Sequence, residues 1–235
     1  MGFSTDPFLF VGKLVRDAYG RQIGRVASFM VNLDGRIDGV LVVRGDGEFF
    51  RYPNNLFVAD DDDVTLLSPT EQRAKTLCDE MPLVWRKDQA LNKLVENEKI
   101  PPEMFDDLHE NFENALNQLK ADAQTTLEKL DKEVVRCSQQ VIELRLAMLH
   151  LEVEHEMGEI DEKSYQTIEM LQVSLSRVEA EKGNLEAIRN KLSNILSEKT
   201  KQTEMEKKPP QTALMLPEPP VTVNVRNLGK RVLGV

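Results

Sequence analysis

A heptad repeat in the middle of the chain places the strongest limit on how this protein can fold. Two interleaved apolar rows recur every seven residues: Leu127, Val134, Val141 and Met148 in one, and Ala123, Leu130, Cys137, Leu144 and Leu151 in the other. Such spacing is typical of a helix that buries a seam against other helices. Pro101-Pro102 and Met157-Gly158 bound a predicted helix from Glu103 to Glu156. At 1.5 Å per residue it would be about 80 Å long, so a coiled coil is expected.

Two shorter helices are predicted on either side, from Leu83 to Glu98 and from Glu162 to Lys199, with Pro82 as a helix stop. Gly158 suits a left-handed helix C-cap and Asp161 suits an N-cap, so the chain should reverse direction there. The last helix carries an apolar row consisting of Ile168, Leu171, Leu175, Val178, Leu185, Leu192 and Leu196. We therefore expect residues 70–200 to form an N-shaped coiled-coil hairpin rod, with the shorter helices antiparallel to the long one.

The long helix also has a second apolar row, which consists of Val135, Ile142, Leu146, Leu149 and Val153. One partner helix cannot bury two rows, and a wider apolar stripe indicates more than two helices around the same stretch. The second apolar row is therefore a predicted self-association surface, in a symmetric dimer or in the repeating contact of a filament. The alternative interpretation is an exposed face of modest hydrophobicity.

Residues 1–69 show the alternating pattern of β-strands. The runs that we interpret as strands are Phe8 to Arg16, Arg25 to Leu33, Ile37 to Arg44, Glu48 to Tyr52 and Val64 to Leu67. Asp34-Gly35 and Asp46-Gly47 lie between alternating runs, and Asp-Gly is a strong hairpin signal because glycine tolerates positive φ. The chain is thus predicted to be an α+β protein, with a small antiparallel β-barrel, a long antiparallel coiled coil and a disordered tail.

Three stretches of this β region resemble the PRC-barrel family. They are residues 11–17 (VGKLVRD), 20–26 (GRQIGRV) and 34–43 (DGRIDGVLVV). The resemblance implies a small barrel whose glycines serve turns, and a domain that acts as an interaction module and not as a catalyst.

The last 35 residues differ from the rest of the chain in composition and periodicity. Residues 201–220 contain five prolines among Lys, Glu, Gln and Thr, a composition typical of a disordered or polyproline-like linker. Residues 221–235 follow, and Val221, Val223 and Val225 have the two-residue period of a strand. A lone strand must find hydrogen-bond partners, so this segment is predicted to bind another protein by strand addition. The alternatives are a frayed tail or a strand that completes the protein's own β domain.

Composition gives no support for catalysis. The two cysteines, Cys78 and Cys137, have no zinc-type or disulfide-framework spacing and are interpreted as reduced core residues. The strongest metal-like grouping is His150, Glu152, His155, Glu156 and Glu159, which is interpreted as the exposed carboxylates of a coiled-coil tip. No apolar run approaches the roughly 20 residues that span a bilayer, so membrane contact should be peripheral. We expect no enzyme activity, no cofactor and no metal.

The order of the segments, with a PRC-like barrel, a long helical hairpin, a Pro-rich linker and a Val-x-Val-x-Val peptide, resembles the CdvA family of archaeal cell-division proteins. The resemblance implies a cytoplasmic scaffold that assembles at mid-cell on the inner face of the membrane. It also implies recruitment of the ESCRT-III homologue CdvB, whose winged-helix domain binds the C-terminal peptide. The positions that match this peptide are Val221, Val223, Val225, Arg226, Leu228, Val232 and Leu233.

Association with lipid and with DNA is also implied by the family, but no motif places either contact in this chain. Two rival functions are a nucleoid-associated DNA-binding coiled coil and a barrel-containing adaptor of RNA processing. Both predict an affinity for nucleic acid that falls steeply with salt.

Overall fold

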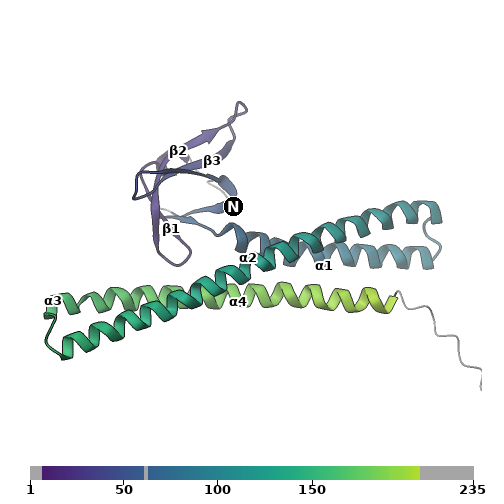
Figure 1. The fold of residues 1–235 in the computed structure, drawn as a ribbon. Coiled ribbons are helices and arrows are strands. Elements are labelled where there is room, and N and C mark those ends of the chain that lie inside the picture. The colour runs from purple at the N-terminus through teal and green to yellow at the C-terminus, as the bar shows by residue number, and fades with distance from the viewer. Residues whose placement is uncertain (1–6, 61–62, 207–235) are drawn as a thin grey trace, which may run out of the picture.

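The computed structural model describes residues 7–60 and 63–206 and shows a β domain seated on a long helical rod (Figure 1). This confirms the predicted α+β layout. The elements of the β domain are η1 (Pro7–Phe10), β1 (Leu14–Asp17), β2 (Gln22–Val31), β3 (Ile37–Val43), β4 (Phe49–Pro53), η2 (Asn54–Leu56), β5 (Phe57–Asp60) and β6 (Asp63–Leu66). The helices are α1 (Pro69–Glu96), α2 (Pro102–Glu156), α3 (Glu162–Tyr165) and α4 (Thr167–Glu206).

The six strands form one sheet in the order β4-β3-β2-β1-β6-β5. Its two edge strands, β4 and β5, are joined by only the three residues of η2, so the sheet has to roll until its edges approach. The rings of Tyr52 and Phe57, one from each edge strand, pack edge to face with centroids 6.1 Å apart. The two edges are nevertheless not hydrogen-bonded to each other, and the β1–β6 pair is parallel. The expected antiparallel barrel is thus a rolled, open sheet.

Strand boundaries differ from the sequence expectation at two places. The run Phe8 to Arg16 is divided into the 3-10 turn η1 and the short strand β1. Strand β5, which sequence analysis missed, follows η2 directly and pairs with β6. The two predicted Asp-Gly turns are confirmed, because Gly35 and Gly47 both have positive φ. A small core fills the roll, and its most deeply buried members are Val15, Val26, Val40, Val42, Phe57 and Val64.

The long helix and the reversal that follows it agree with the sequence prediction. Helix α2 begins one residue before the predicted Glu103 and ends at Glu156 as predicted. Gly158 has a φ of 72° and its backbone N–H donates to the carbonyl oxygen of His155, so it forms the predicted left-handed cap. Asp161 is the predicted N-cap, and its carboxylate accepts a hydrogen bond of 2.9 Å from the N–H of Ser164.

The prediction for the first helix was wrong, because α1 begins at Pro69 and runs through Pro82. Proline removes one helical hydrogen bond and normally ends or kinks a helix. Here the cost is offset by burial: Met81, directly before the proline, and Leu77, one turn earlier, are completely buried. The start was readable from Ser68-Pro69-Thr70-Glu71, since the Ser68 hydroxyl caps the N–H of Glu71 and proline is favoured in a first helical turn.

The greater length of α1 changes the cross-section of the rod. Helices α1 and α4 both run antiparallel to α2, as expected, but they overlap along its middle, so three helices pack together there (Figure 1). The shared core consists of Ala74, Leu77, Cys78, Met81, Ala123, Leu130, Cys137, Val178, Leu185, Ile188 and Leu192. Both cysteines are free and buried, as predicted. None of the described helices is long and apolar enough to cross a bilayer.

Candidate interaction surfaces

The β domain is fixed to the rod by the loop between β1 and β2. Within this loop, the Asp17 carboxylate accepts hydrogen bonds from the backbone N–H groups of Tyr19 (2.9 Å) and Arg21 (2.8 Å). The same carboxylate pairs with the Arg21 side chain at 2.5 Å. These contacts hold the loop in one shape and turn the side chains of Tyr19 and Arg21 towards the helices.

Tyr19 connects the loop with two helices that are remote in sequence. Its hydroxyl donates to Glu71 Oε1 of α1 at 2.8 Å, and Asn184 Nδ2 of α4 donates to the Tyr19 oxygen and to Glu71 Oε2, both at 2.8 Å. Burial raises the pKa of the Tyr19 hydroxyl well above its ordinary value, and the Glu71 carboxylate raises it further against the opposing effect of Asn184. The group therefore stays protonated and acts as a structural donor.

Arg21 connects the same loop with α2 and α4 through a buried carboxylate. Glu181 of α4 is only 6% exposed. Its two oxygens lie 2.8 Å from Arg21 Nη1 and 2.8 Å from Arg136 Nη2 of α2. A buried carboxylate is costly unless it is paired, and this one is paired from two elements. We refer to Asp17, Tyr19, Arg21, Glu71, Arg136, Glu181 and Asn184 as the joint.

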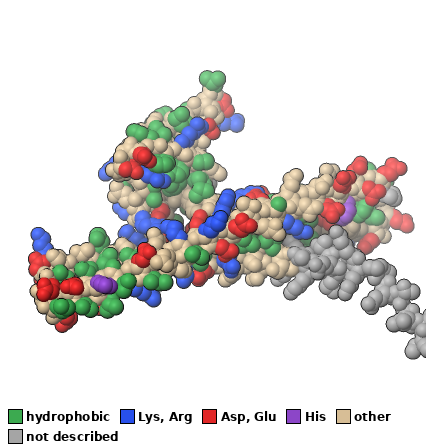
Figure 2. Space-filling model, in the orientation of Figure 1, with side chains coloured by type: hydrophobic (Ala, Val, Ile, Leu, Met, Phe, Trp, Pro, Cys, Tyr) green, Lys and Arg blue, Asp and Glu red, His purple; other side chains and the backbone are tan. Residues whose placement is uncertain are grey.

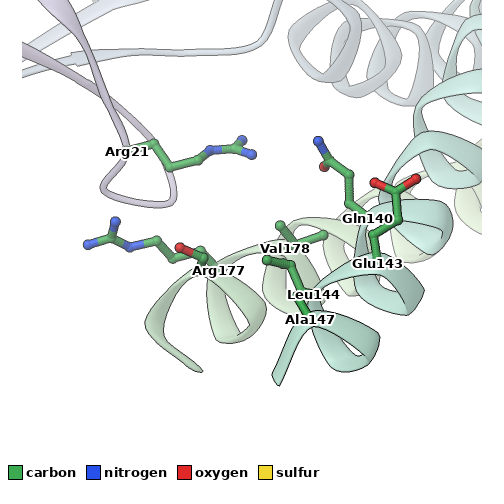
Figure 3. Close-up of a pocket in the computed structure, with 8 residues that line it drawn as sticks. Arg21, Gln140, Glu143, Leu144, Ala147, Arg177 and Val178 are labelled. Carbon is green, nitrogen blue, oxygen red and sulfur yellow. The ribbon is translucent and has the colours of Figure 1, made fainter. Parts of the chain in front are cut away.

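A cavity of about 440 Å³ lies beside the joint, between the β1–β2 loop and the α2–α4 hairpin. In Figure 3, Arg21 reaches from the β1–β2 loop above Leu144, Ala147 and Val178, and Gln140 and Glu143 lie on the opposite side of the cavity from Arg177. The hydroxyl of Ser174, which also lines the cavity, donates to the carbonyl oxygen of Met170 in its own helix. The lining thus carries both positive and negative side chains around apolar ones. The engaged Ser174 hydroxyl is poorly placed for nucleophilic attack.

The metal-like grouping of the sequence does not come together as a site. His155 Nε2 lies 3.4 Å from Glu162 Oε2, and its ring stacks on Tyr165 with centroids 4.1 Å apart. Among the described residues, no three His, Cys, Asp or Glu side chains are placed to hold a metal ion. Burial raises the pKa of both Cys78 and Cys137, which keeps their thiols protonated inside the rod core.

The second apolar row lies on the surface of the rod. Its side chains are between 47% (Val153) and 68% (Val135) exposed, whereas Leu130 and Cys137 of the seam are completely buried. Figure 2 shows apolar side chains gathered on the arm of the rod that carries the α2–α3 turn. The exposure of this row is suited to the predicted self-association.

The predicted partner-binding residues Val221, Val223, Val225, Arg226, Leu228, Val232 and Leu233 lie outside the described residues. The joint was missed by sequence analysis. Tyr19 lies 165 residues from Asn184 and 52 from Glu71 in the chain. No spacing rule connects positions so far apart, and each of the three residues on its own is an ordinary loop or helix residue.

The chain resembles known proteins over most of its length. A family model described as the CdvA-like coiled-coil domain matches residues 71–213, which begin in the first turn of α1. The chain is also similar to Cell division protein A of Sulfolobus acidocaldarius, with 24% identity over 187 residues that cover 79% of this chain and 78% of the relative.

Proposed function

The chain belongs to the family of CdvA-like coiled-coil proteins, and we propose that it is a non-enzymatic scaffold of cell division that self-assembles and recruits an ESCRT-III homologue. The similarity to Cell division protein A supports the cell-division role. The assembly is proposed to form in the cytoplasm at mid-cell, on the inner face of the membrane, where it contacts lipid peripherally.

The observation that carries the scaffold proposal is the rod itself. Helix α2 runs for 55 residues without a break, and the joint fixes the β domain on the flank of the rod with a partly buried ion pair and hydrogen bonds. A long helix packed on two others is a rigid spacer, since its length cannot change without unpacking the core. The exposed second apolar row gives this spacer a surface through which copies can associate, as a dimer or as a filament.

Recruitment is assigned to the C-terminal peptide. Residue 207 follows α4 directly, so the tether starts towards the end of the rod remote from the α2–α3 turn (Figure 1). The predicted linker began at residue 201, but α4 continues to Glu206, so the linker is shorter than expected. All five of its prolines lie in residues 207–220, and prolines favour extended chain. The alternating valines that follow can then add as a strand to the winged-helix domain of a CdvB-type partner, with main-chain hydrogen bonds supplying affinity and alternate side chains supplying specificity.

A pull-down with the ESCRT-III homologue tests this assignment. Val223→Asp places a charge on the partner-facing side of the strand, so we expect retention of the partner to be lost or reduced at least tenfold. Thr222→Asp is the matched control, because its side chain points to the opposite side of the strand and should leave most of the binding intact. Equal binding by wild type and Val223→Asp would refute strand addition by this peptide.

The alternative function, a nucleoid-associated DNA-binding coiled coil, has weaker support. Several arginines of the rod are already paired with carboxylates: Arg73 with Asp122, Arg136 with Glu181 and Arg145 with Glu179. With a net charge of −10, the chain also repels DNA as a whole. Nuclease treatment separates the two functions, since partner recruitment by the peptide should survive it.

A further inference from the structure

We propose that a second copy of this chain docks on the second apolar row in antiparallel orientation, with a two-fold axis that is level with Leu144 along α2 but lies on the opposite face of the helix. The inference rests on the proposed self-association and specifies its partner, its direction and its register.

Two faces of α2 are occupied within one chain. The seam that contains Leu130, Cys137 and Leu144 is buried against α4. The flank that contains Arg136 and Gln140 borders the joint and the cavity beside it. At 100° per residue, the second apolar row lies about 130° from the seam and about 130° from that flank. No described element of the same chain covers this third face, as the exposure of the row shows.

The spacing of the row is symmetric about one position. Val135 and Val153 are equally far from Leu144, and so are Ile142 and Leu146. Leu149 has Gln139 as its counterpart, which belongs to the same stripe of the helix. A two-fold interface places the same patch of each copy against the other, so such a pattern is self-complementary when the helices run in opposite directions. The antiparallel register centred on Leu144 pairs four of the five row residues with apolar residues and buries the fifth, Leu149, against Gln139.

A parallel pairing would also bury the row, but it is opposed by charge. N-terminal to Val135 the same face of α2 is polar and acidic, with Asp106, Glu110, Asn117, Gln124 and Glu128 along it. All five are exposed. In a parallel dimer each carboxylate would lie opposite the same carboxylate of the second copy. Like charges placed opposite each other across an interface repel. In the antiparallel arrangement the two acidic stretches point away from each other, far beyond the screening length of about 10 Å at ordinary salt.

The antiparallel arrangement also sets the positions of the tails. Ion pairs between Arg136 and Glu181 and between Asp131 and Arg189 keep α4 in step with α2. If this alignment continues, Glu206 at the end of α4 lies beside a residue of α2 that is about 30 positions N-terminal of Leu144. At 1.5 Å per residue, that is about 45 Å from the proposed two-fold axis. The two tethers would therefore start about 90 Å apart, at opposite ends of one continuous rod.

Disulfide cross-linking of the full chain tests direction and register together. Val135→Cys and Val153→Cys are prepared as separate chains, one of them with a tag that changes its size, and are mixed, equilibrated and oxidised. The antiparallel register brings the two different cysteines into the 4.4–6.8 Å Cα range of a disulfide, whereas like cysteines are about 27 Å apart. We expect the mixed product to exceed either like-with-like product at least tenfold. Gln124→Cys, on the polar part of the same face, is the control and should not cross-link.

Light scattering on the same samples distinguishes a failure of the antiparallel arrangement from a failure of the proposed self-association. Like-with-like products of Val135→Cys or Val153→Cys would show a parallel dimer, and an oligomer without any cross-link would show another contact. Either result overturns the antiparallel inference and leaves self-association standing. A monomer at all concentrations would overturn both. The wild-type chain, whose own Cys78 and Cys137 are buried, should give no cross-linked product.

Discussion

At the scale of single residues, the joint holds the two parts of the molecule in one arrangement. Tyr19, Glu71 and Asn184 come from the β domain, α1 and α4, and each makes a hydrogen bond of 2.8 Å with both of the others. Such a closed polar triangle depends on every member, because the removal of one leaves the others short of a partner in a partly dry site. The orientation of the β domain is therefore sensitive to small changes in this loop.

The first prediction at this scale concerns the tyrosine hydroxyl. Tyr19→Phe removes one donor to Glu71 and one acceptor for Asn184, and should lower the free energy of unfolding by about 1 kcal/mol. Faster amide hydrogen exchange in residues 17–21 should accompany the loss, since the loop is then held mainly through Arg21. Tyr165→Phe, the same chemical change at the rod tip, is the control. Unchanged exchange in the loop would mean that the triangle does not hold the β domain.

The raised pKa of Tyr19 gives this prediction a pH dependence. Because its pKa is higher in the folded state, the Tyr19 hydroxyl keeps its proton in the folded protein at pH values at which the unfolded chain has lost it. The stabilisation is fully present below the ordinary tyrosine pKa of about 10, and it is lost as the pH rises above that value. The stability difference between wild type and Tyr19→Phe should thus shrink between pH 10 and 11.5 in denaturant titrations. A difference that stays constant from pH 8 to 11.5 would contradict it.

At the scale of elements, Pro82 is the clearest conflict between local preference and tertiary structure. It lies inside α1, one residue after the buried Met81. Proline in a helix interior costs about 3 kcal/mol, part of which is recovered when neighbouring turns relax. We expect Pro82→Ala to raise the free energy of unfolding by roughly 1–3 kcal/mol, as measured by urea denaturation.

Lys87→Ala, at an exposed position of the same helix, is the control and should change the free energy of unfolding by less than about 0.5 kcal/mol. A destabilised Pro82→Ala would show that the proline ring contributes packing that outweighs its backbone cost.

The elements also show where sequence reasoning succeeds. The bounds of α2 and the cap at Gly158 were predicted within a residue, because heptads and caps are local signals repeated many times. The start of α1 was missed because Pro82 was taken as the helix boundary and the capping signal at Ser68 was not considered. Strand β5 was missed because four residues that directly follow a turn carry little periodicity. The parallel β1–β6 pair and the joint depend on contacts between distant segments, which no local pattern encodes.

At the scale of the whole molecule, the proposed self-association of the rod would determine how many tails act together. A single strand peptide is expected to bind weakly, since its ordering costs entropy at the moment of binding. Two or more tails on one rigid assembly make later binding events intramolecular, and avidity can then exceed the single-site affinity by 10²–10⁴-fold without any new contact. In this view the second apolar row controls recruitment even though it never touches the recruited protein.

The last prediction separates the affinity of a single tail from the avidity of several tails on one assembly. Leu146→Glu with Leu149→Glu places charges in the second apolar row, so the chain should become monomeric by light scattering. Its affinity for a soluble partner domain should stay within about twofold of wild type, because the peptide is unaltered. On a surface densely coated with that domain, however, its dissociation rate should be at least tenfold higher than that of wild type, since each monomer is then bound through one tail only.

Asn117→Glu with Gln124→Glu is the control, because it adds the same charge to the polar part of the same face. This variant should match wild type in all three measurements. If the row variant keeps the wild-type mass, the row is not an interface. If it becomes monomeric and dissociates at the wild-type rate, recruitment does not depend on multivalency.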